Sequence, residues 1–412
     1  MNPILIKNNN IDSCTIFFIF NVGSINENNN KLGISHFIEH MIFKGNKQIK
    51  KSNNLLKKLD SIGGDYNAFT TNNLTGYHIK VMKEYQIEAF TIMYNMLFFS
   101  NFDEFEINTE REVIKEEYSK DKNDYDSLIE QMTQKIVLRN TPYSKPIIGT
   151  LKTINSINKK DLINYWKKYY SLSNCVLVIN GNIKKQLLDH LRKIKFKDFP
   201  YKFTEYNISI PKNPIIKIMK TEDIQTTLSI AFRTCGLNNN DKYTIDLISN
   251  IIGGNMSSRL FLALRERYGI VYEINCENTF FRDIGYLQIT CSFDNHNLNK
   301  IIEIILKELI ILKTNYITKE ELIVNKNFLK SMELLEFEDT ISFCEDIATE
   351  YILTGKINMP EKNIELYNNL DKYQIKNISN QIFTKKNMNI IILGDYNEKK
   401  IISELNHKIS EF

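Results

Sequence analysis

Three side chains in one short segment, residues 33–46, have the types and spacing of a metal site with a proton carrier beside it. The segment reads GISHFIEHMIFKGN and contains His36, Glu39 and His40. On a helix, residues four apart lie one turn apart on the same face, so both imidazoles can reach one ion at the ~2.0–2.1 Å of zinc–nitrogen bonds. Glu39 lies three residues after His36 and shares that face. The spacing therefore predicts a zinc site with a carboxylate beside the metal-bound water.

The order of these residues, HxxEH, is the inverse of HExxH and is the inverzincin signature. A bound cation lowers the pKa of water to around 7, and a neighbouring carboxylate can take that proton and later deliver it to a leaving amine. In a chain with only six histidines, chance produces on the order of 0.01 such motifs. The remaining histidines have no partner at ligand spacing, and we interpret them as structural: His78, His190, His296 and His407.

A catalytic zinc site needs a third protein ligand and an open fourth position for water. The candidates lie in the acidic segment TEREVIKEEYSKD, residues 109–121, where Glu110 and Glu117 are seven residues apart on one predicted helix face. Glu116 is the alternative ligand if the register differs by one residue. Taken alone, a run of glutamates on a helix is usually a solvated face. The histidines upstream are what favour a ligand role.

The composition around these residues is that of an ordinary globular protein. Hydrophobic residues make up 42% and charged residues 25% of the 412 residues, which excludes a disordered or fibrous chain. The formal charge of +4 does not favour a nucleic-acid partner, because phosphate binding needs a strong basic excess. The apolar runs are far shorter than the ~20 residues of a spanning helix, so we expect no membrane association.

Two further features bear on the compartment. The first ten residues have neither the apolar core of a signal peptide nor the Arg-rich amphipathic pattern of a transit peptide. The six cysteines form no CxxC pair and no disulfide framework. We therefore expect a cytoplasmic or otherwise soluble intracellular protein with reduced, buried thiols.

The two halves of the chain share one order of elements at an offset of about 210 residues. In each half, an apolar strand pattern precedes a helix that ends near a Gly-Asn pair, at Gly45 in the first half and at Gly254 in the second. A strand and an amphipathic helix follow, then a second long helix, then a closing strand. This predicts an α+β fold of two homologous domains, each a mainly antiparallel sheet with helices packed on one face. The predicted boundaries are 1–199, a linker at 200–214 that contains three of the seven prolines, and 215–412.

Several of these segments together resemble the insulinase/pitrilysin (M16) family of zinc metallopeptidases, and especially its processing-peptidase-like branch of short, two-domain chains. The resemblance rests on HFIEHMIFKG, on the ER-x-VI-x-EE run, on NTPYSKPIIGTLKTINSINKKDL, and on GGDYNAFTTNNLTGYH at residues 63–78. It implies that His36, His40 and Glu117 bind one Zn²⁺ per chain. It also implies that Glu39 is the general base and acid, and that Glu110 orients the site.

The same resemblance implies a substrate-binding strand and a contribution from the second half. Asn67 and Ala68 would lie on an exposed strand edge that pairs with an extended peptide, although an ordinary edge hairpin turning at residues 72–73 explains the pattern equally well. Within GGNMSSRLFLALRERYGIVYEI, Arg265 and Tyr272 match a pair that contacts substrate and steadies the oxyanion. At the place of HxxEH the second half has Ile245, Ile248 and Ser249, so we expect no second zinc site.

Two positions depart from the family pattern. The chain starts close to its first predicted strand, so we expect an edge strand common in the family to be absent. Asn46 stands where Thr is common, and we expect this difference to change little.

The resemblance thus predicts a zinc metalloendopeptidase that hydrolyses unfolded or extended peptide segments within a dimer chamber. The partner would be a second copy or a homologous chain, because 412 residues supply only one of the two halves that enclose substrate in larger members. The alternative is a non-catalytic structural or assembly subunit of the same fold. Such subunits usually lose part of HxxEH or the distal Glu, and this chain keeps both. A zinc-stabilised scaffold is disfavoured because structural zinc normally has four protein ligands.

Overall fold

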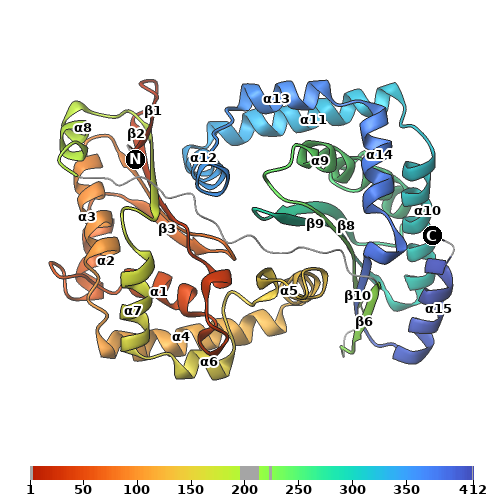
Figure 1. The fold of residues 1–412 in the computed structure, drawn as a ribbon, viewed down its shortest axis with the longest axis horizontal. Helices are drawn as coiled ribbons and strands as arrows, with labels where there is room; N and C mark the ends of the chain where they lie inside the picture. Colours follow the sequence, from red (N-terminus) through yellow and green to blue (C-terminus); the bar gives the residue numbers. More distant parts are fainter. Residues whose placement is uncertain (1–2, 195–212, 222–224, 411) are drawn as a thin grey trace. The chain divides into compact units, whose positions relative to one another are not determined.

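The computed structural model describes residues 3–194, 213–221, 225–410 and 412, and its contacts divide the chain into two units (Figure 1). The first unit comprises Met1–Lys120, Lys145–Thr204 and Leu335–Met359. The second comprises Asp121–Ser144, Glu205–Leu334 and Pro360–Phe412. Each unit is built around one five-stranded sheet with helices, so the predicted α+β class with two similar domains is confirmed.

The sheet of the first unit has the strand order β1-β5-β2-β4-β3. Its strands are β1 (Ile4–Lys7), β2 (Ser13–Phe20), β3 (Asp65–Thr70), β4 (Thr75–Met82) and β5 (Cys175–Gly181). β1 runs parallel to β5, and the other neighbours are antiparallel. Strand β1 forms one edge, so the expectation of an absent edge strand is wrong: four residues suffice for it. Strand β3 forms the other edge.

Helices of the first unit precede or follow these strands in sequence. They are α1 (Ile34–Ile42), α2 (Ser52–Ser61), α3 (Gln86–Phe98), α4 (Glu104–Asn123), α6 (Leu151–Ser156), α7 (Lys159–Tyr169), α8 (Lys185–Leu191) and α12 (Thr340–Thr354). The last three residues of α4 are grouped with the second unit. The two helices that matter for the site, α1 and α4, are the ones predicted to carry the histidines and the glutamates.

The sheet of the second unit has the equivalent order β6-β10-β7-β9-β8. Its strands are β6 (Ile215–Met219), β7 (Gln225–Cys235), β8 (Glu273–Phe280), β9 (Ile284–Asp294) and β10 (Met388–Leu393). Its helical segments are α5 (Tyr125–Val137), α9 (Asp241–Ile252), the π-helix η4 (Phe261–Arg267), α10 (Leu298–Thr314), α11 (Lys319–Glu338), α13 (Pro360–Asn369), α14 (Lys372–Ile382) and α15 (Glu398–Ser410). The last four residues of α11 are grouped with the first unit. The matching strand orders support the predicted duplication.

Each sheet also receives one helix from the opposite half of the sequence. Helix α12 packs on β2 and β5, and helix α5 packs on β7 and β10. Thr340 Oγ1 lies 2.8 Å from Thr15 Oγ1 of β2, and Thr133 Oγ1 donates to Ser229 Oγ of β7 at 2.8 Å. The prediction of helices on one face is therefore incomplete, and the compact units are not two contiguous stretches of sequence.

Covering both faces explains the composition of the central strands. In β2, alternate residues such as Ile16 and Phe18 belong to the core shared with α1 and α3, whereas Thr15 faces α12. Residues 14–20 are all buried as a result. A strand buried on both faces reads as a continuous apolar run instead of an alternating one.

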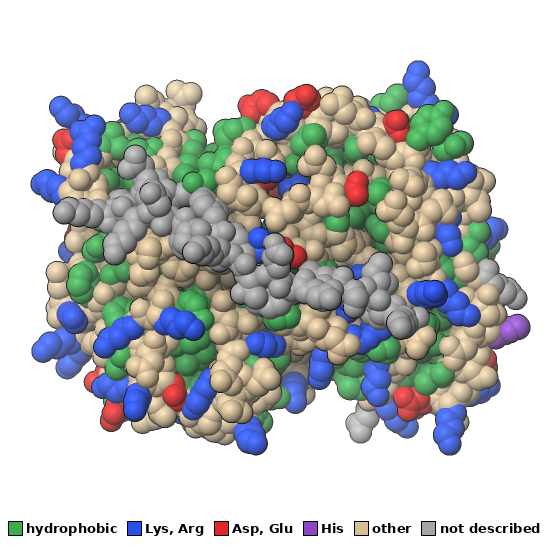
Figure 2. All heavy atoms as spheres, in the orientation of Figure 1, with side chains coloured by type: hydrophobic (Ala, Val, Ile, Leu, Met, Phe, Trp, Pro, Cys, Tyr) green, Lys and Arg blue, Asp and Glu red, His purple; other side chains and the backbone are tan. Residues whose placement is uncertain are grey.

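Other predictions can be compared with the described residues. All six cysteines are free, and five are buried, as expected. Most of the predicted linker, residues 200–212, lies outside the described residues. Among the described helices, none is long and apolar enough to cross a bilayer. On the face shown in Figure 2, Lys and Arg side chains are spread over the surface, with fewer Asp and Glu side chains among them.

Candidate metal centre

Helix α1 begins directly after Gly33, a position where the backbone angle and the close packing both require glycine. Gly33 has φ 90°, and a Cβ there would lie 2.4 Å from Ile148 O. Gly149, with φ 86°, is equally crowded, because its Cβ would lie 2.3 Å from Leu32 O. Glycine tolerates both the positive φ and the close approach. The segment that follows Lys145 therefore packs directly against the start of α1. This contact connects the segment NTPYSKPIIGTLKTINSINKKDL to the site, to which the sequence linked it only by resemblance.

A buried carboxylate accepts hydrogen bonds from backbone N–H groups at the start of α1. Glu27 accepts hydrogen bonds from Gly33 N at 2.7 Å and from Ser35 N at 2.9 Å. Lys145 Nζ donates to Glu27 O at 2.7 Å and ties the same loop to residue 145. Burial raises the pKa of Glu27 to about 7, against the two backbone hydrogen bonds and Lys145, which lower it. The sequence analysis missed Glu27, because a lone Glu before a helix carries no spacing signal.

Helices α1 and α4 bring His36, His40 and Glu117 together. Their ligand atoms all lie within 4.8 Å of one another. His36 Nε2 lies 3.5 Å from Glu117 Oε1, and His40 Nε2 lies 3.5 Å from Glu117 Oε2. Two atoms each ~2.1 Å from a tetrahedral zinc ion would be about 3.4 Å apart. The donor set therefore fits a zinc ion, and it is the only such group among the described residues.

The alternative ligand Glu116 is exposed and is not part of the group. The Glu117 side chain is 39% exposed, so the three ligands leave a side open to solvent. Three protein ligands and an accessible fourth position are what catalytic zinc sites have.

Two charged residues, Glu110 and Lys44, form a chain of polar contacts that starts at His40 Nδ1. Glu110 Oε2 lies 3.0 Å from His40 Nδ1, and Lys44 Nζ lies 2.6 Å from Glu110 Oε1. Burial works to raise the pKa of Glu110, but the contacts with His40 and Lys44 outweigh it and lower that pKa. An ionised Glu110 accepts a hydrogen bond from Nδ1–H of His40 and leaves Nε2 as the ligand atom. Lys44 is a further residue that sequence reasoning missed.

Within this cluster, hydrogen bonds and neighbouring charges shift the pKa values of His40 and Glu117. Burial works to lower the pKa of His40, but hydrogen bonds to Glu110 and Glu117 and the charge of Glu39 raise it to about 9. Hydrogen bonds from His36 and His40 hold the pKa of Glu117 well below its usual range. An imidazolium at His40 must lose its proton before a metal binds, so metal binding is expected to release protons.

Glu39 lies on the same helix and contacts strand β3. Thr70 Oγ1 donates a hydrogen bond of 2.6 Å to Glu39 Oε2. Thr70 belongs to the GGDYNAFTTNNLTGYH stretch, but the sequence analysis singled out only Asn67 and Ala68 there. The hydroxyl could not be assigned from spacing, because Thr70 and Glu39 are thirty-one residues apart.

Asn67 and Ala68 lie on β3, the edge strand of the first sheet. Asn67 is exposed, and its Oδ1 accepts from Ala68 N at 2.9 Å. Because an antiparallel strand alternates the direction of its backbone groups, the N–H of Ala68 points away from β4. The hairpin does turn at residues 71–74, where Thr71 N donates to Leu74 O, so an edge and a hairpin coexist.

Arg265 and Tyr272 belong to the second unit. Arg265 is exposed on η4, with its guanidinium 5.9 Å from the centre of the Phe261 ring. Tyr272 is exposed, and its hydroxyl donates to Asp294 Oδ1 at 3.1 Å. The structure thus places each on its own side-chain partner.

The counterpart of α1 in the second unit is α9, and its register differs by one residue from the predicted one. The buried apolar residues of the two helices match at an offset of 210: Phe37, Ile38, Met41 and Ile42 correspond to Leu247, Ile248, Ile251 and Ile252. The equivalents of HxxEH are therefore Asp246, Ser249 and Asn250. The prediction of Ile245, Ile248 and Ser249 is wrong, because the Gly-Asn pair used to align the halves follows α9 one residue sooner than it follows α1.

Contacts with the next long helix support this register. Helices α4 and α11 each have twenty residues, and aligning them end to end matches Glu110 with Asn325. Asn250 Nδ2 donates to Asn325 Oδ1 at 2.8 Å, as His40 contacts Glu110. The second unit therefore has neutral amides where the first has an imidazole and a carboxylate.

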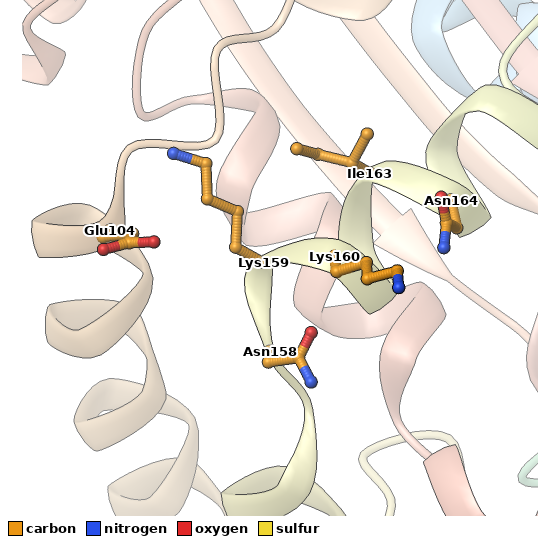
Figure 3. A pocket seen from close by; sticks show the side chains of 6 residues that line it. All are labelled: Glu104, Asn158, Lys159, Lys160, Ile163 and Asn164. Carbon is orange, nitrogen blue, oxygen red and sulfur yellow. The ribbon is translucent and has the colours of Figure 1, made fainter.

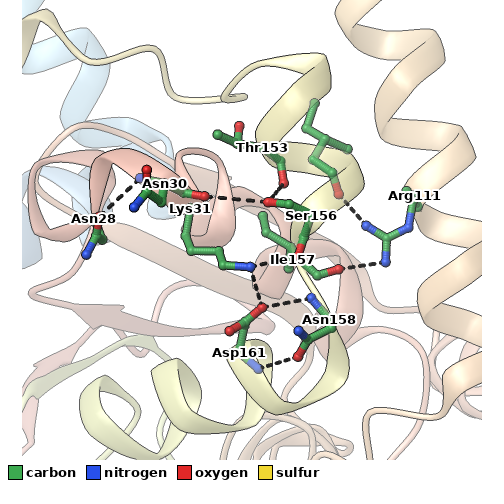
Figure 4. Close-up of polar contacts among 10 residues, drawn as sticks. Asn28, Asn30, Lys31, Arg111, Thr153, Ser156, Ile157, Asn158 and Asp161 are labelled. Carbon is green, nitrogen blue, oxygen red and sulfur yellow. Dashed lines mark hydrogen bonds and ion pairs between the residues drawn. The ribbon is translucent and has the colours of Figure 1, made fainter.

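A basic residue fixes the helix that carries the glutamates (Figure 4). Arg111 donates through Nη2 to Ile157 O at 2.8 Å and through Nη1 to Ile154 O. Nearby, Lys31 Nζ lies 2.7 Å from Asp161 Oδ2. The two bonds of Arg111 join α4 to α6 and to the turn that follows it, and so restrain the helix that bears Glu110 and Glu117.

A pocket between α4 and α7 lies away from the metal ligands (Figure 3). It is lined by Glu104, Asn158, Lys159, Lys160, Ile163 and Asn164. Glu104 precedes Glu117 by thirteen residues on α4, or about 20 Å along a helix. The pocket is open and contains none of the residues described above, so we assign it no part in the chemistry.

Comparison with known proteins gives a consistent result. A sequence profile described as insulinase (peptidase family M16) matches residues 3–151, and one described as the peptidase M16 inactive domain matches residues 156–329. An uncharacterized zinc protease of Rickettsia felis is 32% identical, covering 93% of this chain and 92% of that protein. The mitochondrial-processing peptidase subunit beta of Saccharomyces cerevisiae is 26% identical, covering 98% and 91%.

Among solved structures, a protease from Helicobacter pylori has a TM-score of 0.86 and 20% sequence identity. The match covers 96% of this chain and 97% of that one. At this identity the likeness concerns the fold, and it extends over both units.

Proposed function

The chain belongs to the insulinase family of peptidases, M16, and from this membership and its site we propose that it is a zinc-dependent endopeptidase. The observation that carries the proposal is the group formed by His36, His40 and Glu117 with Glu39 on the same helix. The two relatives described above as zinc protease and processing peptidase support the same class of reaction.

His36, His40 and Glu117 would hold one zinc ion per chain. When bound, zinc supplies Lewis-acid activation of a water molecule and of the peptide carbonyl. Glu39 takes the proton of the attacking water and delivers it to the leaving amine. Glu110, backed by Lys44, keeps His40 in the tautomer that offers Nε2.

The substrate would be an unfolded or extended peptide added to the edge of β3. The N–H of Ala68 points outward and donates a hydrogen bond to Asn67 Oδ1. In the complex this N–H would instead pair with the peptide backbone, as in other cases of strand addition. Arg265 and Tyr272 would contact substrate and steady the oxyanion of the tetrahedral intermediate.

The test of this function is cleavage of a random peptide library by three samples: the zinc-loaded chain, the chelated chain, and the chelated chain after return of zinc. We expect cleavage only in the first and third samples, and the cut sites also report sequence preference. Absence of cleavage by a fully zinc-loaded chain would favour the non-catalytic assembly subunit instead.

We also propose that the working form is a dimer, with a second copy or a homologous chain. The beta relative from yeast is named as a subunit, and family members of this length supply one half of a chamber. The test mixes Glu39→Gln and Arg265→Ala chains, each nearly inactive alone, under conditions that allow subunit exchange. Return of activity supports shared sites, and its absence after confirmed exchange contradicts them.

A further inference from the structure

We infer that Thr70 is a positioning residue that holds the proton carrier Glu39 to the substrate-binding strand. This inference rests on the proposed function and adds a residue that neither the motif nor the comparisons assign. It starts from one contact, the 2.6 Å hydrogen bond from Thr70 Oγ1 to Glu39 Oε2.

The contact is well defined on the side of Glu39. Among the described residues, Thr70 is the only hydrogen-bond partner of the Glu39 carboxylate. A carboxylate that accepts one proton must keep a fixed direction toward the water it activates, and a glutamate has three rotatable bonds. One short bond to a hydroxyl removes most of that freedom. It leaves the second oxygen, Oε1, without a hydrogen-bond partner in the part of the chain that the structure describes.

The contact is equally well defined on the side of Thr70. Threonine is branched at Cβ, so its χ1 and the direction of its hydroxyl are restricted. Thr70 is the last residue of β3 and pairs with Thr75 of β4. The turn beyond it is closed by Thr71 N to Leu74 O at 2.8 Å and is joined to the preceding loop by Ser24 N to Thr71 O at 3.3 Å. The hydroxyl is therefore presented from a fixed backbone.

The neighbour on the other face of the strand adds to this rigidity. A Cβ at Gly76 would lie 2.5 Å from the ring of Phe69, so the ring lies directly over the backbone of β4. Side chains alternate along a strand, which puts Phe69 on one face and Ala68 and Thr70 on the other, toward α1. The same strand thus offers its edge to substrate and its hydroxyl to Glu39.

In the second unit, the position equivalent to Thr70 can be compared where the residue equivalent to Glu39 is not a carboxylate. The last pair of its corresponding hairpin is Phe280 with Gly285, as Thr70 with Thr75 is in the first. Phe280 packs on the hydrophobic core, and the residue equivalent to Glu39 is Ser249. A hydroxyl occurs at the strand end in the unit that has Glu39, and an aromatic ring occurs in the unit that lacks it.

The test compares Thr70→Val and Thr70→Ser with the zinc-loaded parent chain. Valine keeps the shape and the branching but has no hydroxyl, and we expect kcat to fall roughly 10- to 100-fold, the usual loss for an outer partner. KM and zinc content should stay unchanged, and serine should recover most of kcat. Thr71→Val is the matched control: it weakens the same hairpin without touching Glu39, so it should lower the urea midpoint and keep kcat.

An unchanged kcat in Thr70→Val would overturn the inference, as would equal losses in Thr70→Ser or a loss explained by missing zinc. A second readout needs no activity. In the metal-free chain, Thr70→Val should lower the urea midpoint when residue 39 is Glu and not when it is already Ala. If the parent chain cleaves no peptide, the proposed function fails, and an absent coupling in this cycle would then separately overturn the contact itself.

Discussion

Helices α1 and α4 of the first unit and helices α9 and α11 of the second occupy corresponding places in a duplicated fold, yet they treat their polar residues in opposite ways. The first pair keeps two imidazoles and the three carboxylates of Glu39, Glu110 and Glu117, with Glu117 partly open to solvent. In the second pair, Asn250 donates to Asn325, and Asp246 and Ser249 both accept from Asn278 of β8. The duplicated scaffold can evidently hold either arrangement.

In the second unit, neighbouring side chains donate hydrogen bonds to the carboxylate of Asp246 and to the hydroxyl of Ser249. Asn278 Nδ2 donates to Asp246 Oδ1 at 2.9 Å and to Ser249 Oγ at 2.8 Å, and the Tyr367 hydroxyl donates to Asp246 Oδ2 at 3.3 Å. Burial raises the pKa of Asp246 to about 6 even so. The comparison teaches that a buried acid alone does not make a site: ligands must also share an open side.

The largest difference between the units should be catalytic. Glu39→Gln removes the proton carrier and no ligand, so we expect kcat to fall by about 10²- to 10⁴-fold with zinc retained. Ser249→Ala, the matched change in the second unit, should leave kcat near that of the parent. Steady-state kinetics with metal analysis checks both, and near-normal hydrolysis by zinc-loaded Glu39→Gln would remove the proposed mechanism.

Metal affinity should rank three of the six glutamates of α4. Glu117→Gln removes a ligand and should weaken zinc binding most, Glu110→Gln should weaken it by roughly 10- to 100-fold as an outer partner, and the exposed Glu116→Gln should leave it unchanged. Competition with a chromophoric chelator measures all three. A loss in Glu116→Gln with none in Glu117→Gln would show that the third ligand is misassigned.

The pH dependence of stability should reveal one buried acid in each unit. Asp246 has a pKa of about 6 in the folded chain against 3.8 ordinarily, and Glu27 has about 7 against 4.5. Within each window the folded state keeps a proton that the unfolded state has lost, so the free energy of unfolding falls as pH rises. Each shift corresponds to at most about 3 kcal/mol.

Urea unfolding from pH 4 to pH 8 provides the measurement. We expect Asp246→Asn to remove the fall between about pH 4 and 6, and Glu27→Gln to remove the fall between about pH 4.5 and 7. A variant whose pH profile parallels that of the parent would show that its carboxyl does not titrate in that window.

The smallest expected effect is on stability and concerns α5 and α12, the helices that pack on the sheet formed by the other half of the sequence. Thr340→Val leaves Thr15 Oγ1 buried without a partner and should lower the free energy of unfolding by about 1–3 kcal/mol. The double variant Thr15→Val with Thr340→Val should recover most of that loss, because neither hydroxyl is then unsatisfied. In the second unit, Ser229→Ala should cost less, since Thr133 Oγ1 also lies 3.5 Å from Gln288 Nε2. Additive losses in the double variant would contradict the pairing of Thr15 with Thr340.

Local periodicity accounts for much of what could be predicted. His36 and His40 share a face because helices repeat every 3.6 residues. The duplication was visible because equivalent elements recur in order. Its register was not, since a Gly-Asn pair beyond the helix is a weaker marker than the buried face of the helix itself.

The sequence by itself determined the histidine pair with its glutamate, the α+β class and the repeat, because each depends on residues close together in the chain. Only the tertiary structure decided that Glu117 and not Glu116 faces the histidines, and that Thr70 bonds Glu39. It also decided that Glu27 and Lys145 hold the start of α1, and that α5 and α12 each pack on the sheet formed by the other half of the sequence. Apart from the bonds of Glu27 to Gly33 and Ser35, which are six and eight residues away, these contacts join residues tens to hundreds of positions apart. Local spacing carries no information about which distant groups folding brings within hydrogen-bond distance.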